Sequence, residues 1–140
     1  MISRMAEDPE TVSHGALSSI TKRETPMDFK AHLETANENL TGFKGVNPDA
    51  ANGFTQLHMA TMAEGSVSVK HKELIALSIG IVRQCTDCIG FHVKAAIKAG
   101  ATKDEIAETV GVCVMMGGGP AYMYGVGALE AYDQLIGAES

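Results

Sequence analysis

The chain has 140 residues, 45% hydrophobic and 20% charged, a composition that suits one globular domain with a buried core. Its formal net charge of −6 and the lack of a Lys/Arg cluster argue against a nucleic-acid-binding surface. The apolar stretches are broken by charges and glycines, so we expect a cytoplasmic protein without a secretory signal or a membrane contact.

Residues 1–25 are polar and show little apolar periodicity. They are predicted to form an N-terminal arm that is loose, or ordered only at an interface. Residues 26–140 are predicted to form one helical domain.

The first predicted helix follows Pro26, which suits a first helical turn, and it ends at Gly42. A turn over residues 45–49 leads to a second helix from about Pro48 to Ala63. Ser68 then caps a third helix over residues 69–82. Its apolar residues leave little polar surface and predict deep burial: Leu74, Ile75, Leu77, Ile79, Ile81 and Val82.

The fourth predicted helix starts near Thr86 and ends at Gly100, which suits a left-handed cap. Thr102 and Glu105 form a capping-box pattern that opens the next helix. Residues 117–120, Gly-Gly-Gly-Pro, should interrupt or bend it before a last helix. No segment alternates as a strand does, so the fold class is all-α, with about five to six helices.

Several glycines lie inside helical patterns, where each costs roughly 1 kcal/mol relative to Ala. We therefore expect close approach of helix backbones at these positions: Gly80, Gly90, Gly111, Gly125 and Gly127.

Cys85, Cys88 and His92 form a C-x-x-C-x-x-x-H run, whose members share one face if the segment is helical. In a reducing compartment such a pair points to catalysis or metal binding rather than to a structural staple. A helix N-terminus and a nearby imidazole both favour the thiolate of Cys88, and Cys85 could trap an oxidised Cys88 as a disulfide. Cys113 has no partner motif and is interpreted as a small buried hydrophobic residue.

His92 is placed to act as a base toward Cys88. Glu73 is the one carboxylate in an otherwise apolar helix, so it should be paired or have a raised pKa. Either state suits proton transfer with His92. The alternative is a partly exposed Glu73 that pairs with Lys70 or Lys72.

The order Glu73, Cys85, Cys88, His92 and then Met-Gly-Gly-Gly-Pro-Ala resembles the AhpD-like (alkylhydroperoxidase) branch of the carboxymuconolactone decarboxylase superfamily, over roughly residues 48–135. The resemblance implies a single-domain helical fold with the C-x-x-C pair at a helix N-terminus, assembled into homotrimers or homohexamers. It also implies an antioxidant peroxidase without a bound cofactor or metal.

In that scheme Cys88 attacks a hydroperoxide substrate, Cys85 forms the disulfide, and Glu73 with His92 relays protons. A dithiol partner, lipoylated or thioredoxin-like, then reduces the disulfide.

Two alternatives stay open at this stage. The first is a decarboxylase of the same superfamily that acts on a small lactone acid and does not depend on the cysteines. The second is a zinc-stabilised helical binding module, in which Cys85, Cys88 and His92 supply three ligands. Its fourth ligand would be Glu73, His71 or Cys113.

Overall fold

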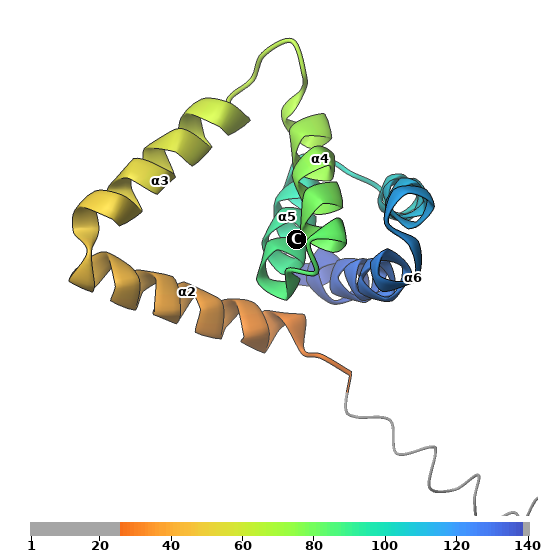
Figure 1. Cartoon of the computed structure of the whole chain (residues 1–140), viewed down its shortest axis with the longest axis horizontal. Coiled ribbons are helices and arrows are strands. Elements are labelled where there is room, and N and C mark those ends of the chain that lie inside the picture. Colours follow the sequence, from red (N-terminus) through yellow and green to blue (C-terminus); the bar gives the residue numbers. More distant parts are fainter. Residues whose placement is uncertain (1–25, 139–140) are drawn as a thin grey trace, which may run out of the picture.

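A computed structural model describes residues 26–138, so the predicted arm over residues 1–25 lies outside the described part. Its α-helices are α2 (Phe29–Val46), α3 (Pro48–Met62), α4 (Val69–Val82), α5 (Thr86–Lys98) and α6 (Lys103–Leu135), followed by the 3-10 turn η1 (Ile136–Ala138). No strand occurs within residues 26–138, which confirms the all-α prediction. Figure 1 shows α4 and α5 beside the bent α6, and α2 and α3 as a separate arm.

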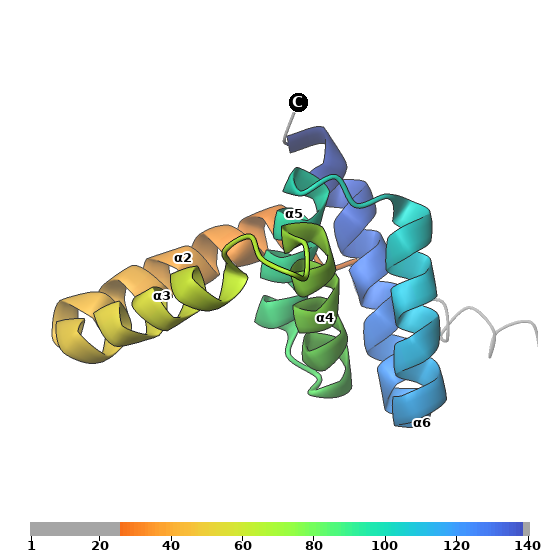
Figure 2. The same cartoon turned by 90° about the horizontal axis from the view of Figure 1, so that it is seen from above.

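The core lies where α4, α5 and α6 pack together and the first turns of α2 cover them (Figure 2). Its largest fully buried side chains are Leu77, Ile81, Ile89, Val93 and Ile106. Burial of each such side chain contributes roughly 1.5–3 kcal/mol, so this three-helix contact provides most of the stability.

The helix α4 has the predicted bounds and the predicted cap, since Ser68 accepts a hydrogen bond from the backbone N–H of His71. The predicted deep burial of all its apolar side chains is wrong, however. Leu77 and Ile81 are buried, whereas Ile75 and Ile79 are 54% and 58% exposed. The apolar surface of α4 is wider than the stripe that α5 and α6 cover.

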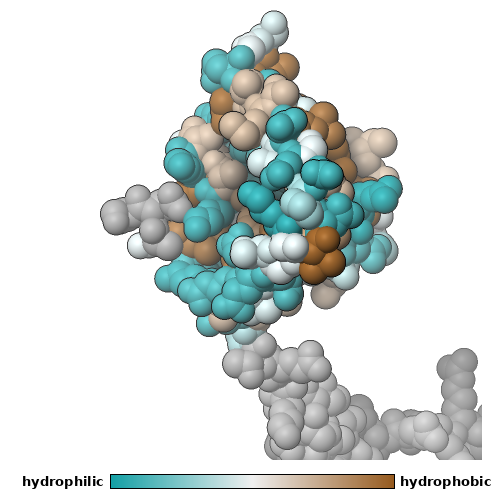
Figure 3. Space-filling view, turned by 90° about the vertical axis from the view of Figure 1, so that its left-hand side faces the viewer, coloured by the Kyte–Doolittle hydropathy of each residue, from teal (hydrophilic) through white to brown (hydrophobic). Residues whose placement is uncertain are grey.

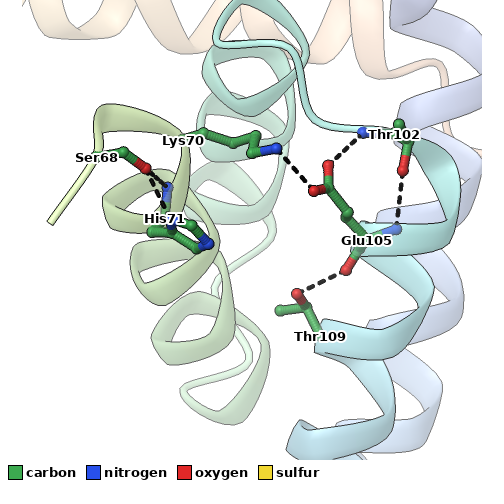
Figure 4. Close-up of polar contacts among 6 residues, drawn as sticks. All are labelled: Ser68, Lys70, His71, Thr102, Glu105 and Thr109. Atoms are coloured by element: carbon green, nitrogen blue, oxygen red, sulfur yellow. Dashed lines mark hydrogen bonds and ion pairs between the residues drawn. The ribbon is translucent and has the colours of Figure 1, made fainter.

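The capping box at the start of α6 is confirmed. Glu105 accepts a hydrogen bond from the N–H of Thr102, while Thr102 Oγ1 accepts one from the N–H of Glu105. Figure 4 shows that Lys70 reaches the same carboxylate from α4, with Nζ 2.7 Å from Oε1. This contact ties the beginning of α4 to the beginning of α6.

The helix α6 folds back on itself at the predicted Gly-Gly-Gly-Pro segment. Gly118 has φ 68° and ψ −152°, outside the helical region, and Pro120 follows it. Figure 2 shows the two halves side by side, and a Cβ on Gly125 would strike the side chain of Val110.

Among the described residues, α6 is the one helix long and apolar enough to cross a membrane by length and composition. Each half is shorter than the ~30 Å hydrocarbon core, at roughly 23 Å (residues 103–117) and 26 Å (residues 119–135). The bend therefore gives α6 the shape of a helical hairpin rather than of one continuous span.

The predicted end of the first helix at Gly42 is wrong, because α2 continues to Val46. Its glycines keep helical torsions, and only Asn47 separates it from α3, so the predicted turn over residues 45–49 is a single residue. The side chain of Asn47 caps α3 by accepting from the N–H of Ala50. At the other end Asp28 is the N-cap, so Pro26 lies before the helix and not in its first turn as predicted.

The second arm, formed by α2 and α3, has few buried side chains. α3 has no buried residue, and α2 has only Phe29 and Leu33. Figure 3 views the molecule from this side, where hydrophilic residues cover most of the face and hydrophobic ones show at several separate places. The large exposed apolar side chains of the arm are Leu40, Phe43, Val46, Phe54, Leu57 and Met59.

The expected close approach of helix backbones is confirmed at Gly80, where a Cβ would lie 3.6 Å from backbone atoms of Cys88 and Ile89. At Gly90 and Gly125 the close neighbours are side chains. A Cβ on Gly80 or Gly90 would lie within about 3.1 Å of a neighbouring helix's atoms, and one on Gly125 would overlap Val110. Within the single chain, Gly111 and Gly127 have nothing within 4 Å of such a Cβ.

Candidate functional site

The loop between α4 and α5 holds the first cysteine by backbone hydrogen bonds. The N–H of Gln84 donates to the carbonyl of Ile81 at 3.0 Å, and the N–H of Cys85 donates to the carbonyl of Gly80 at 2.9 Å. This pair of bonds is a Schellman motif, which requires a left-handed residue after the helix. Gln84 takes that conformation with φ 57°, and no other non-glycine residue among the described ones has a positive φ.

Cys85 ends that motif and is also the N-cap of α5. Its Sγ accepts a hydrogen bond from the N–H of Cys88 at 3.2 Å, and its carbonyl accepts one from Ile89. The sulfur therefore lies at the positive end of the helix dipole, where a thiolate is favoured. Cys85 and Cys88 are joined as a disulfide with their Cα atoms 5.2 Å apart.

Glu73 and His92 meet across the contact between α4 and α5. The Nδ1 atom of His92 lies 2.8 Å from Oε2 of Glu73. The Glu73 side chain is only 6% exposed and that of His92 is 23% exposed, so the pair is shielded from water. His92 follows Cys88 by four residues, one turn of α5, so the two side chains share one face of that helix.

The alternative pairing of Glu73 with a lysine is not what the structure contains. Lys70 binds Glu105, and Lys72 donates to the carbonyls of Thr61 and Ala63. Glu73 is thus free of both lysines and engaged by the histidine of the motif.

Two of the possible fourth ligands of a zinc site, His71 and Cys113, have other partners. His71 binds Ser68 at the start of α4, and the buried Cys113 contacts the carbonyl of Ser78. Between residues 26 and 138, no three His, Cys, Asp or Glu side chains converge in a way that could hold a metal ion. The burial of Cys113, 2% exposed, agrees with its interpretation as a core residue.

A second contact between a histidine and a carboxylate at the motif could not be predicted from the sequence. Nε2 of His32, on α2, lies 2.7 Å from Oδ1 of Asp87, between the two cysteines; the distance is that of an ion pair, but the angles are not those of a hydrogen bond. The two residues are far apart in the chain and neither belongs to a recognisable pattern. The contact joins α2 to the first turn of α5.

An apolar hollow of about 280 Å³ lies beside Thr86, the other residue between the cysteines. Its walls come from the start of α2, from α5 and from the second half of α6. They consist of Met27, Phe29, Thr86, Ile89, Met123, Tyr124, Gly127 and Glu130. The hollow can take a small, mainly apolar molecule.

The sequence matches the model of the Carboxymuconolactone decarboxylase family over residues 48–131, which contain all four candidate site residues. An uncharacterised protein of Cupriavidus necator is 33% identical over 108 residues, covering 77% of this chain and 96% of that protein. "Uncharacterized protein 4 in cox locus" of Paracoccus denitrificans is 37% identical over 98 residues, covering 70% and 86%.

Two solved structures share the fold. A carboxymuconolactone decarboxylase family protein from Legionella pneumophila is 38% identical with a TM-score of 0.75, covering 77% of this chain and 96% of that one. One from Thermotoga maritima, for which a role in the antioxidative response has been suggested, is 26% identical with a TM-score of 0.69, covering 77% and 92%. The chain therefore belongs to the carboxymuconolactone decarboxylase family.

Proposed function

We propose that the chain is a thiol-dependent peroxidase, or disulfide oxidoreductase, of the AhpD-like branch of its family. The observation that carries the proposal is the Glu73–His92 pair, buried one helical turn from a bonded Cys85–Cys88 pair. A decarboxylase has no need of two cysteines at bonding distance. A helix N-terminus together with a paired imidazole is the setting in which a thiol becomes reactive.

In the proposed cycle the Cys88 thiolate attacks the outer oxygen of a hydroperoxide ROOH. The O–O bond breaks, the alkoxide leaves as ROH after taking a proton, and Cys88 becomes a sulfenic acid. The Cys85 thiolate then attacks that sulfur, the S–S bond forms, and the hydroxide leaves as water. Because Nδ1 of His92 is held by Glu73, its other ring nitrogen remains to pass the protons.

The return to the dithiol requires two electrons and two protons from a second dithiol. One thiolate of that partner attacks the disulfide to form a mixed disulfide, and its second thiol releases the enzyme. A lipoylated or thioredoxin-like protein is the proposed reductant, in the cytoplasm. The apolar hollow beside Thr86 supports an organic hydroperoxide as the substrate.

Self-assembly into homotrimers or homohexamers is part of the same proposal. An isolated helix of the length of α3 is marginal in water, yet α3 has no buried residue. The arm and α6 together expose many large apolar side chains, which a neighbouring subunit could cover. Light scattering after size exclusion should give three or six chains, and a monomer at micromolar concentration would contradict this part.

The function is tested by treating the reduced protein with one equivalent of cumene hydroperoxide and measuring its mass. We expect the loss of two hydrogens, located by peptide mapping at Cys85 and Cys88. Cys88→Ser should abolish peroxide consumption, whereas Cys85→Ser should still allow one oxidation of Cys88. An unoxidised pair, with a double Cys→Ser variant that still decarboxylates a small lactone acid, would favour the decarboxylase instead.

A further inference from the structure

Gly80 contacts both cysteines of the candidate site. Its carbonyl accepts the hydrogen bond from the N–H of Cys85 at 2.9 Å. Its Cα faces Cys88, because a Cβ built on Gly80 would lie 3.1 Å from Cβ of Cys88 and 3.6 Å from the carbonyl carbon of Cys88. Gly80 is therefore the point on α4 against which the disulfide rests.

Backbone torsion does not explain a glycine here. Gly80 lies inside α4 without a positive φ, and an interior helix glycine costs roughly 1 kcal/mol relative to Ala. The reason is space, since Cβ of Cys88 and the N–H of Ile89 belong to the beginning of α5 and cannot rotate away as the end of a long side chain could. Gly111, whose missing side chain faces nothing within 4 Å, has no such constraint.

The same face of α4 holds the rest of the site. Glu73 precedes Gly80 by seven residues, which is two helical turns, and His92 follows Cys88 by one turn. The two helices thus meet at two points. One is the contact of Glu73 with His92, and the other is the close approach of Gly80 to Cys88.

We propose that Gly80 is a positioning residue that holds Cys88 at bonding distance from Cys85 and so sets the thiol–disulfide equilibrium of the pair. The functional reason for this arrangement rests on the proposed thiol function. The predicted effect of Gly80 on the thiol–disulfide equilibrium does not. Ala at position 80 keeps the carbonyl and its hydrogen bond to Cys85, and it adds one methyl group against Cys88.

The two redox states should respond differently to that methyl group. In the disulfide, Cys88 is tied through its sulfur to Cys85, whose own N–H is held by residue 80. In the dithiol, Cys88 can shift by a few tenths of an ångström. Gly80→Ala should therefore destabilise the disulfide form more and move the equilibrium about threefold to tenfold toward the dithiol, where tenfold corresponds to about 30 mV.

The test is a redox titration of the full chain in dithiothreitol buffers, with thiols counted by alkylation and mass. Gly80→Ala should show the shift, and Gly111→Ala should not. A merely structural defect would lower the unfolding temperature of both redox states equally and leave the equilibrium unchanged. That result, or an equal shift in both variants, would overturn the proposal.

A second measurement covers the case in which Gly80→Ala does not fold. Cys88→Gly removes the Cβ that the new methyl group would meet, so Gly80→Ala should be tolerated in that background. A double variant that stays unfolded while Cys88→Gly alone folds would also refute the role of the contact. Neither measurement uses peroxide, so a positive result here without peroxide turnover would reject the peroxidase and keep the positioning role.

Discussion

The buried carboxylate of Glu73 lies 2.8 Å from Nδ1 of His92 and joins α4 to α5. An unpaired carboxylate at this depth would cost several kcal/mol, so the pair removes a penalty as well as orienting the imidazole. The pair fixes which ring nitrogen of His92 remains for other partners, and this is the property that a proton relay to Cys88 needs.

Glu73→Gln should slow the oxidation of Cys88 by hydroperoxide by about a hundredfold. The amide keeps the shape and can still contact His92, but it cannot accept a proton or stabilise the imidazolium. The measurement is a rapid-quench reaction with cumene hydroperoxide followed by alkylation of the remaining thiol. The matched control is Glu108→Gln, an exposed carboxylate on α6, which should react at the original rate.

The second prediction concerns the stability of the contact between α4 and α6 in acid. The hydrogen bond from Lys70, helped by the one from the backbone of Thr102, holds the pKa of Glu105 below its usual value of 4.5 (Figure 4). A lowered pKa means that the ionised form stabilises the fold. That contribution is fully present above pH 4.5 and is lost as the pH falls through the lower pKa of the folded state.

Urea unfolding of the wild type and of Glu105→Gln over a pH series checks this prediction. Gln can still serve in the capping box, so the difference reports mainly the charge. The wild type should be the more stable protein at neutral pH, and the difference should shrink in acid. A difference that grows as the pH falls would contradict the assigned direction.

Gly90→Ala should destabilise the protein by roughly 1–3 kcal/mol by overpacking. A Cβ at this position would lie 2.9 Å from Cδ2 of Leu33 and 3.3 Å from Cδ1 of Phe29, the two buried residues of α2. Gly53→Ala in α3, where nothing lies within 4 Å, should instead be neutral or stabilising. The free energy of unfolding in denaturant measures both, and equal effects would refute the close packing of α2 on α5.

Gln84→Gly should stabilise the fold by up to about 1 kcal/mol. A left-handed residue with a Cβ is strained by ~1–2 kcal/mol, and glycine removes that strain at a smaller entropic cost. Arg83→Gly is the matched control, because Arg83 has φ −79° and gains nothing from glycine. If both variants lose stability to the same extent, the strain at Gln84 is not significant.

Local signals predicted the region of the site well. Each signal lies within one or two helical turns of the residues whose conformation it sets. Ser68 and the Thr102–Glu105 box set the starts of α4 and α6 as predicted, and Gly100 takes the left-handed conformation expected of it, with φ 89°. The spacing placed Cys85 at the N-cap of α5, Cys88 in its first turn and His92 one turn further along the helix.

What the sequence could not provide depends on distant contacts or on what lies outside the chain. The contact of His32 with Asp87 depends on how α2 crosses α5, which no local pattern encodes. The exposed Ile75 and Ile79 look the same in sequence as the buried Leu77. An apolar pattern indicates that a residue favours burial. It does not indicate whether the residue is buried by its own chain or by another molecule.

The candidate site is made by a shorter stretch of the chain than the core that supports it. Glu73 and His92 are 19 residues apart, with both cysteines between them, so the whole candidate site comes from one helix–loop–helix segment. The helix α6, which follows later in the sequence, packs against the apolar side of this segment. During synthesis, the reacting groups therefore emerge as neighbours before the helix that keeps them in place has been made.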